Sequence, residues 1–218
     1  MEIGYLSILA LGFVLGIKHA IEPDHVIAVS TIASRSKKLW RSSLSGVFWG
    51  IGHTITLFIF GIFIILMKGE ISTVWAMSLE FLVGIMLVYL GITSIRSIKK
   101  MEGNLHEKHP KDEITYMKSS LIGFVHGLAG SAAMVLLTMS TVESVWEGAI
   151  YILIFGVGTI VGMLFFTTLL GIPFILSSKK VNLNKTFILI TGGISTIFGI
   201  YYMYNLGVTD GLFKLWIQ

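Results

Sequence analysis

Two histidines and two acidic residues lie close together near the start of the chain, in the stretch HAIEPDH. The stretch places His19, Glu22, Asp24 and His25 inside an otherwise apolar run, with Pro23 between the two acids. Imidazole nitrogens and carboxylate oxygens together form a ligand set for a divalent transition metal. Histidine in particular favours nickel, copper, zinc or cobalt over calcium or magnesium. The stretch therefore predicts a site for a transition-metal ion.

The spacing of these residues decides how they can meet. His19 and Glu22 are three residues apart, as are Glu22 and His25, so each pair can be neighbours on a helix. His19 and His25 are six residues apart, which on a regular helix separates them by about 120°. Both can bind one ion only if the helix unwinds between them. Pro23 predicts this break, and because it lacks an N–H it also frees the carbonyl oxygen of His19 as a further candidate ligand.

A structural role is the alternative for the same residues. Lys18 could pair with Glu22 or Asp24 in a buried ion-pair network that only locks the packing of the helices. The number of polar residues in so short an apolar stretch favours the metal site, because intramembrane ionisable residues are costly and usually functional.

Two further histidines lie in apolar segments that are rich in glycine. His53 stands in GVFWGIGHTITLF, after Gly46, Gly50 and Gly52. Small residues let helices approach closely in lipid, so we expect these glycines to press this segment against the first one and to bring His53 to the site. His126 stands in GFVHGLAGSAAM. It is either a secondary ligand or proton acceptor facing the same cavity, or a structural residue.

The composition indicates which elements position these residues. Of the 218 residues, 54% are hydrophobic and only 13% are charged, and the mean hydropathy is +0.84. A soluble domain carries roughly a quarter charged residues, so the chain is predicted to be an all-α integral membrane protein. It contains no cysteine, which excludes disulfides, thiolate metal sites and thiol–disulfide relay chemistry. The net charge of +4 resides in loops and does not indicate nucleic-acid binding.

Six apolar segments are predicted to cross the membrane. The N-terminal one lacks a basic leader and a small-residue cleavage site, so it is expected to be a retained helix. Without a break it would be about 45 Å long, which exceeds a hydrocarbon core of about 30 Å, and we expect it to be broken near Pro23. The predicted spans are residues 3–32, 44–67, 74–95, 119–139, 147–176 and 186–206.

The two halves of the chain resemble each other in their glycines. Three sets of glycines align at offsets of 111, 106 and 108 residues: Gly12 and Gly16 with Gly123 and Gly127, Gly50 and Gly52 with Gly156 and Gly158, and Gly84 and Gly91 with Gly192 and Gly199. Since each half has an odd number of spans, the second half must insert upside down. The pattern predicts a 3+3 inverted repeat, a common plan among transporters. Residues 1–98 form the first three-helix repeat, 99–118 a cytoplasmic loop and 119–218 the second repeat, all within one membrane domain.

Basic residues predict the orientation in the membrane. The loops after the first, third and fifth spans hold thirteen lysines and arginines, whereas the other side has only Lys68 and Lys214. The positive-inside rule then places those three loops in the cytoplasm and both termini outside. His106 and His109 lie in the long cytoplasmic loop and are interpreted as part of a solvated linker.

The histidine motifs resemble those of the nickel/cobalt transporter superfamily. HAIEPDH is similar to the family's histidine–x4–aspartate–histidine signature, GIGHTITLF to its second signature, and GFVHGLAGSAAM to a stretch of its shorter, urease-accessory branch. The resemblance implies that His19, Asp24, His25 and His53 handle the metal, with Glu22 and His126 as secondary residues. The longer members have eight spans and carry aspartate and alanine at the positions of Glu22 and Pro23, a difference that concerns metal preference.

The resemblance implies a function without enzymatic activity. We expect a secondary uptake permease for Ni²⁺, with Co²⁺ as the second candidate, in the inner cell membrane, supplying a nickel enzyme such as urease. The expected partners are the lipid bilayer and the metal substrate, with no cofactor and no nucleic acid; the oligomeric state is left open. The alternatives are a nickel/cobalt exporter, a sulfite-exporter-like anion transporter and a membrane enzyme, although the sequence contains no catalytic motif such as H-E-x-x-H. The anion transporter would need clustered basic residues at the membrane midplane, where Lys18 stands alone.

Overall fold

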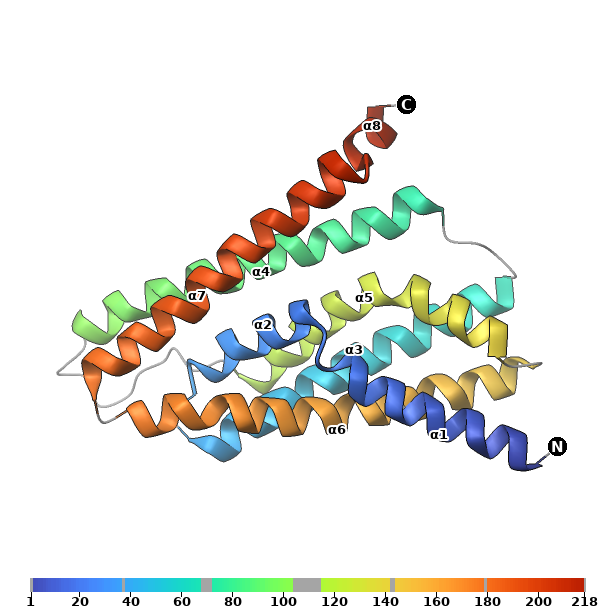
Figure 1. The fold of residues 1–218 in the computed structure, drawn as a ribbon, viewed down its shortest axis with the longest axis horizontal. Coiled ribbons are helices and arrows are strands. Elements are labelled where there is room, and N and C mark those ends of the chain that lie inside the picture. Colours follow the sequence, from blue (N-terminus) through green and yellow to red (C-terminus); the bar gives the residue numbers. More distant parts are fainter. Residues whose placement is uncertain are drawn as a thin grey trace.

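The computed structural model describes residues 2–36, 38–67, 72–103, 115–141, 144–178 and 180–217, with side chains throughout except at residues 2, 3, 5, 99–103, 130–141 and 181. The described residues form helices and contain no β-strand, as the composition predicts. In chain order they are α1 (Glu2–His19), α2 (Pro23–Ala33), α3 (Leu39–Met67), α4 (Thr73–Gly103), α5 (Tyr116–Thr141), α6 (Val145–Ser177), α7 (Val181–Tyr204), the π-helical turn η1 (Asn205–Thr209) and α8 (Leu212–Ile217) (Figure 1).

Four helical segments in the described ranges are long and apolar enough to cross a membrane. They are α3, residues Thr73–Ile98 of α4, α6, and the continuous segment of α7 and η1. The bent pair of α1 and α2 passes the same test together and raises the number to five. Helix α5 is 26 residues long but is not among these segments. The structure therefore supports a multi-pass membrane protein with four or five spans, and the sixth span at residues 119–139 stays a prediction.

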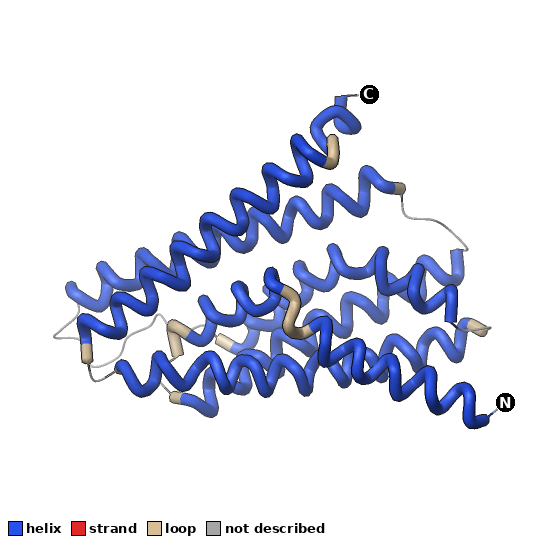
Figure 2. The backbone as a smooth tube through the Cα atoms, viewed as in Figure 1, coloured by secondary structure: helices blue, strands red, loops and turns tan. Residues whose placement is uncertain are grey.

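The helices form two groups with α2 between them. Helices α4 and α7 lie together as a pair, at an angle to the group that contains α1, α3, α5 and α6 (Figures 1 and 2). Helix α2 packs on both groups: its Ala28 lies in a buried cluster with Leu87 of α4, and its Val29 lies in another with Trp49 of α3 and Met163 of α6. Helix α2 thus packs between the two groups beside the predicted site, where α5 also packs directly on α4.

The first predicted span is broken, as Pro23 predicts. Helix α1 ends at His19, α2 begins at Pro23, and the two helices are bent by 58° relative to each other. Glu22 is the extended N-cap residue of α2, and Pro23 occupies the first helical turn, where its missing N–H costs no hydrogen bond. The expectation of a free His19 carbonyl is wrong, because this oxygen accepts a hydrogen bond from the Glu22 N–H at 3.0 Å.

Glycines set the closest helix contacts. In the pair α1–α6, a Cβ added at Gly16 would clash with the backbone carbonyl of Phe155, and one added at Gly158 would clash with that of Phe13. The pair α3–α5 meets in the same way, through Gly52 against the Ser120 carbonyl and Gly123 against the Trp49 carbonyl. The pair α4–α7 meets at two contact points, Gly84 with Gly199 and Gly91 with Gly192. These helices approach to backbone contact, which no larger residue would permit.

The glycines of α3 do not contact the first span, contrary to the sequence-based expectation. Gly46 and Gly50 face α6, at Thr167 and Ile160, and Gly52 faces α5. The sequence pattern shows that a helix face is small but does not show which partner it meets.

Candidate metal site

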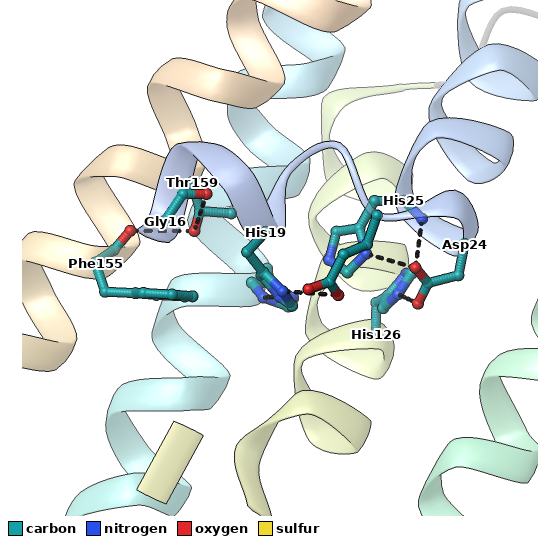
Figure 3. A network of polar contacts seen from close by, with 9 residues as sticks. Gly16, His19, Asp24, His25, His126, Phe155 and Thr159 are labelled. Carbon is teal, nitrogen blue, oxygen red and sulfur yellow. Dashed lines mark hydrogen bonds and ion pairs between the residues drawn. The ribbon is translucent and has the colours of Figure 1, made fainter. Parts of the chain in front are cut away.

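The break between α1 and α2 brings the first two histidines together. The ring centroids of His19 and His25 lie 4.3 Å apart (Figure 3). On a continuous helix the two side chains would point in different directions around the helix axis. The end of α1 is anchored one turn earlier, where the Gly16 carbonyl accepts a hydrogen bond of 3.3 Å from the Thr159 hydroxyl of α6. The predicted condition for a shared site, an unwound segment between the two histidines, is met.

His53 of α3 completes a first triad of ligand atoms. Its Nε2 lies 3.2 Å from the Nε2 of His19, and its ring centroid lies 5.3 Å from that of His25. His25 and His53 are buried, and the Nε2 of His25 has no hydrogen-bond partner within the described part of the chain. One ligand atom from each of the three histidines falls within 4.8 Å of the other two.

Asp24 forms a second triad, in which His126 of α5 takes part. One carboxylate oxygen, Oδ1, accepts hydrogen bonds from the backbone N–H and from Nδ1 of His25, both at 3.0 Å. The other, Oδ2, lies 2.8 Å from Nε2 of His126, which is buried (Figure 3). Asp24, His25 and His126 also offer ligand atoms within 4.8 Å of one another. The structure therefore places His126 at the site.

Glu22 contacts the site from outside both triads. Its Oε2 lies 2.9 Å from Nδ1 of His19, and its side chain is half exposed. A carboxylate on one ring nitrogen fixes the tautomer of a histidine and leaves the other nitrogen free to bind metal. The ion-pair alternative receives no support, since Lys18 is exposed and, among the described residues, forms an ion pair with neither Glu22 nor Asp24.

The sequence motifs do not indicate a role for Trp49, which lies against the buried histidines. Its ring stacks on His53 at a centroid distance of 5.6 Å and meets His25 and His126 edge to face at 5.0 and 5.1 Å. The side chain is fully buried. Trp49 precedes His53 by four residues, so the helical period already places both on one face of α3. His106 and His109 lie outside the described residues.

Comparisons with known proteins agree with this arrangement. The urease accessory protein UreH of Bacillus sp. (strain TB-90) is 67% identical over 100% of this chain and 99% of its own length. A protein of Methanocaldococcus jannaschii, named as a candidate nickel/cobalt efflux system, is 28% identical over 87% of this chain and 88% of its own. The chain belongs to the UreH-type branch of the nickel/cobalt transporter superfamily.

More distant similarities concern the membrane scaffold. A family model described as the cytochrome c biogenesis protein transmembrane region matches residues 74–201, which places this UreH-type chain within that broader membrane family. The chloroplast protein FOR GROWTH AND FERTILITY 2 of Arabidopsis thaliana is 28% identical over 73% of this chain and 46% of its own length. No solved structure matches the chain. The family model, UreH and the Methanocaldococcus jannaschii protein are named as a membrane region, an accessory protein and a transport system, in agreement with a non-enzymatic member of the family.

Glu22→Gln is expected to weaken metal binding by about 10–100-fold, the usual cost of losing a group that orients a ligand. The glutamine retains the size of the side chain but loses the charge that holds Nδ1 of His19. Equilibrium dialysis of the purified protein against Co²⁺ measures the change. Lys18→Met is the matched control on the adjacent turn and should leave the affinity unchanged. Equal losses in the two variants would instead support an ion pair between Lys18 and Glu22.

Proposed function

We propose that this chain is a membrane permease for Ni²⁺, with Co²⁺ as the second candidate, and that it carries the ion inward to supply a nickel enzyme such as urease. The observation that carries the proposal is the partly buried cluster of His19, Asp24, His25 and His53 at the helix break, with His126 and Glu22 beside it. A resident cofactor has no part in the proposal, since the metal is the cargo.

The donor geometry fits a divalent transition metal. Such an ion binds imidazole nitrogens at about 2.0–2.1 Å, so two nitrogens on one ion lie roughly 2.9–3.4 Å apart for octahedral to tetrahedral angles. The 3.2 Å between the Nε2 atoms of His19 and His53 falls within this interval. Nitrogen-rich sites suit nickel and cobalt, whereas magnesium and calcium take oxygen ligands. The donor set therefore supports a late transition metal as the substrate.

The glycine contacts support a 3+3 inverted repeat. If the first three spans correspond to α5, α6 and α7, the pair α1–α6 is the counterpart of α5–α3, and the pair α4–α7 is its own counterpart. These are the pairs that meet through glycines, and the α4–α7 contacts are reciprocal. A two-fold relation between the halves would map the α1–α6 contact onto the α5–α3 contact and the α4–α7 contact onto itself. In such carriers the site lies at the repeat interface, and access alternates as one part rocks against the other.

The proposed orientation places both termini outside and the basic loops in the cytoplasm. It rests on the positive-inside distribution of lysine and arginine. An exporter is the main alternative, and a relative named as a candidate nickel/cobalt efflux system favours testing it. The anion transporter has less support, because the described site gathers imidazoles and carboxylates whereas Lys18 is exposed.

Accumulation of ⁶³Ni²⁺ in cells tests the function and its direction. Cells expressing the wild type should accumulate more nickel than cells with empty vector, and His19→Ala should remove the excess at matched membrane abundance. The control variant His106→Ala, in the predicted linker, should transport like the wild type. Nickel below the vector level, restored by His19→Ala, would indicate export through the same site. No difference among these strains would contradict the metal function.

A further inference from the structure

We infer that the site contains two alternative binding stations for one metal ion, which share His25, and that the ion passes from one station to the other during transport. The inference rests on the proposed function, because both stations bind the same cargo. We define station one as His19, His25 and His53, and station two as Asp24, His25 and His126. Within each station the ligand atoms lie within 4.8 Å of one another.

The two stations cannot act as one coordination sphere. Ligand atoms bound to one ion at about 2.0–2.1 Å are at most roughly 4.2 Å apart. No set larger than these two triads meets even the wider 4.8 Å limit among the described residues. The ring centroids of His53 and His126 are 6.0 Å apart, and each lies closer to that of His25, at 5.3 and 4.1 Å. His53 and His126 fall in different triads of the described residues, so an ion held by one triad must exchange ligands to be held by the other.

His25 is suited to serve both stations. Its Nδ1 donates to Oδ1 of Asp24, a member of station two. Its Nε2 is buried and has no hydrogen-bond partner in the described part of the chain. Nδ1 and Nε2 are separate donor atoms of the same ring, and the nitrogen that carries no hydrogen is the one that binds metal. His25 can therefore stay close to the ion while the other ligands exchange.

The ligands of the two stations lie on different helices. His53 on α3 and His126 on α5 belong to one tightly packed pair, in which a Cβ added at Gly127 would lie 2.7 Å from the His53 carbonyl oxygen. Asp24 and His25 lie on α2, which follows the break after α1 and packs on α3 and α6 through Val29 and on α4 through Ala28. A shift of α2 against α3 and α5 would change which histidine the ion reaches, without any change in the α3–α5 contact.

Cobalt binding to the purified protein distinguishes two stations from one. His53→Ala and His126→Ala should each still bind one Co²⁺ per chain, with an affinity lowered by at most about 100-fold, because each leaves one station intact. The visible absorption spectra of bound Co²⁺ should differ, since His126→Ala retains three nitrogens whereas His53→Ala retains two nitrogens and one carboxylate. His106→Ala is the control and should match the wild type in affinity and spectrum.

Transport in the same variants tests whether both stations are used. In proteoliposomes, His53→Ala and His126→Ala should each lower the rate of Co²⁺ entry at least tenfold although both still bind the ion. The thermal unfolding midpoint establishes that each variant is folded, and His126→Gln repeats the test with a side chain of similar size.

Loss of all Co²⁺ binding in folded His53→Ala, or wild-type transport by His126→Ala and His126→Gln, would overturn the two-station inference. Failure of the proposed function would look different, because the wild type itself would then neither bind Co²⁺ or Ni²⁺ nor transport either ion.

Discussion

Replacement of His25 by alanine is expected to lower the affinity for Ni²⁺ and Co²⁺ at least 100-fold and to reduce nickel transport to the level of empty vector. His25 is the only residue common to both triads of ligand atoms in the described part of the chain. Losing it removes one of three donors from each triad and leaves Asp24 without the hydrogen bond from the ring. Loss of one essential ligand costs more than the 10–100-fold typical of a supporting residue.

Equilibrium dialysis and ⁶³Ni²⁺ accumulation measure this effect. His25→Ala should still insert and accumulate in the membrane, because the ring hydrogen-bonds only to the neighbouring Asp24 in the described part of the chain, whereas glycines set the closest helix contacts. His106→Ala, outside the described residues, is the matched histidine control. Wild-type binding in His25→Ala would show that the triads are not where the metal binds.

Gly16→Ala is expected to destabilise the protein by about 1–3 kcal/mol, the usual cost of overpacking, and to impair transport. The added Cβ would clash with the backbone carbonyl of Phe155, which cannot move aside as a flexible side chain can. To relieve the clash α1 must separate from α6, and His19 lies only one turn beyond Gly16 on the same helix. The hydrogen bond from Thr159 to the Gly16 carbonyl would weaken with it.

The thermal unfolding midpoint in detergent and ⁶³Ni²⁺ accumulation measure the two effects. The matched control is Gly193→Ala, also within a helix, because no atom lies within 4 Å of the added Cβ. There the substitution should be neutral or stabilise by about 0.5–1 kcal/mol, since alanine loses less backbone entropy than glycine. Equal midpoints for the two variants would mean that α1 and α6 are not in backbone contact.

Together these two substitutions separate the chemistry of the site from the scaffold that holds it. His25→Ala should remove binding while leaving the stability largely unchanged. Gly16→Ala should lower the stability of the protein. It should weaken metal binding only indirectly, because His19 is displaced. A protein in which both changes acted only on stability would not support a metal site at the helix break.

Several features followed from the sequence because their causes are local. Pro23 lacks an N–H and therefore ends a helix, so the break and the meeting of His19 with His25 could be expected from residue type and spacing alone. The apolar runs and low charge likewise required helices in a membrane, since backbone groups must be satisfied within each segment there. The chemical type of the ligands is a property of the residues themselves and needs no fold.

The tertiary structure decided what depends on contacts between distant segments. The sequence shows that Gly50 and Gly52 leave room for close helix contacts, but only the packing shows that Gly50 meets α6 and Gly52 meets α5, and that neither meets the first span. In the same way His126 of α5, 102 residues after Asp24 of α2, is brought within 2.8 Å of that carboxylate only by the tertiary packing of the helices. The division of the ligands into two triads is a matter of a few ångströms between helices, a distance that periodicity and residue type do not determine.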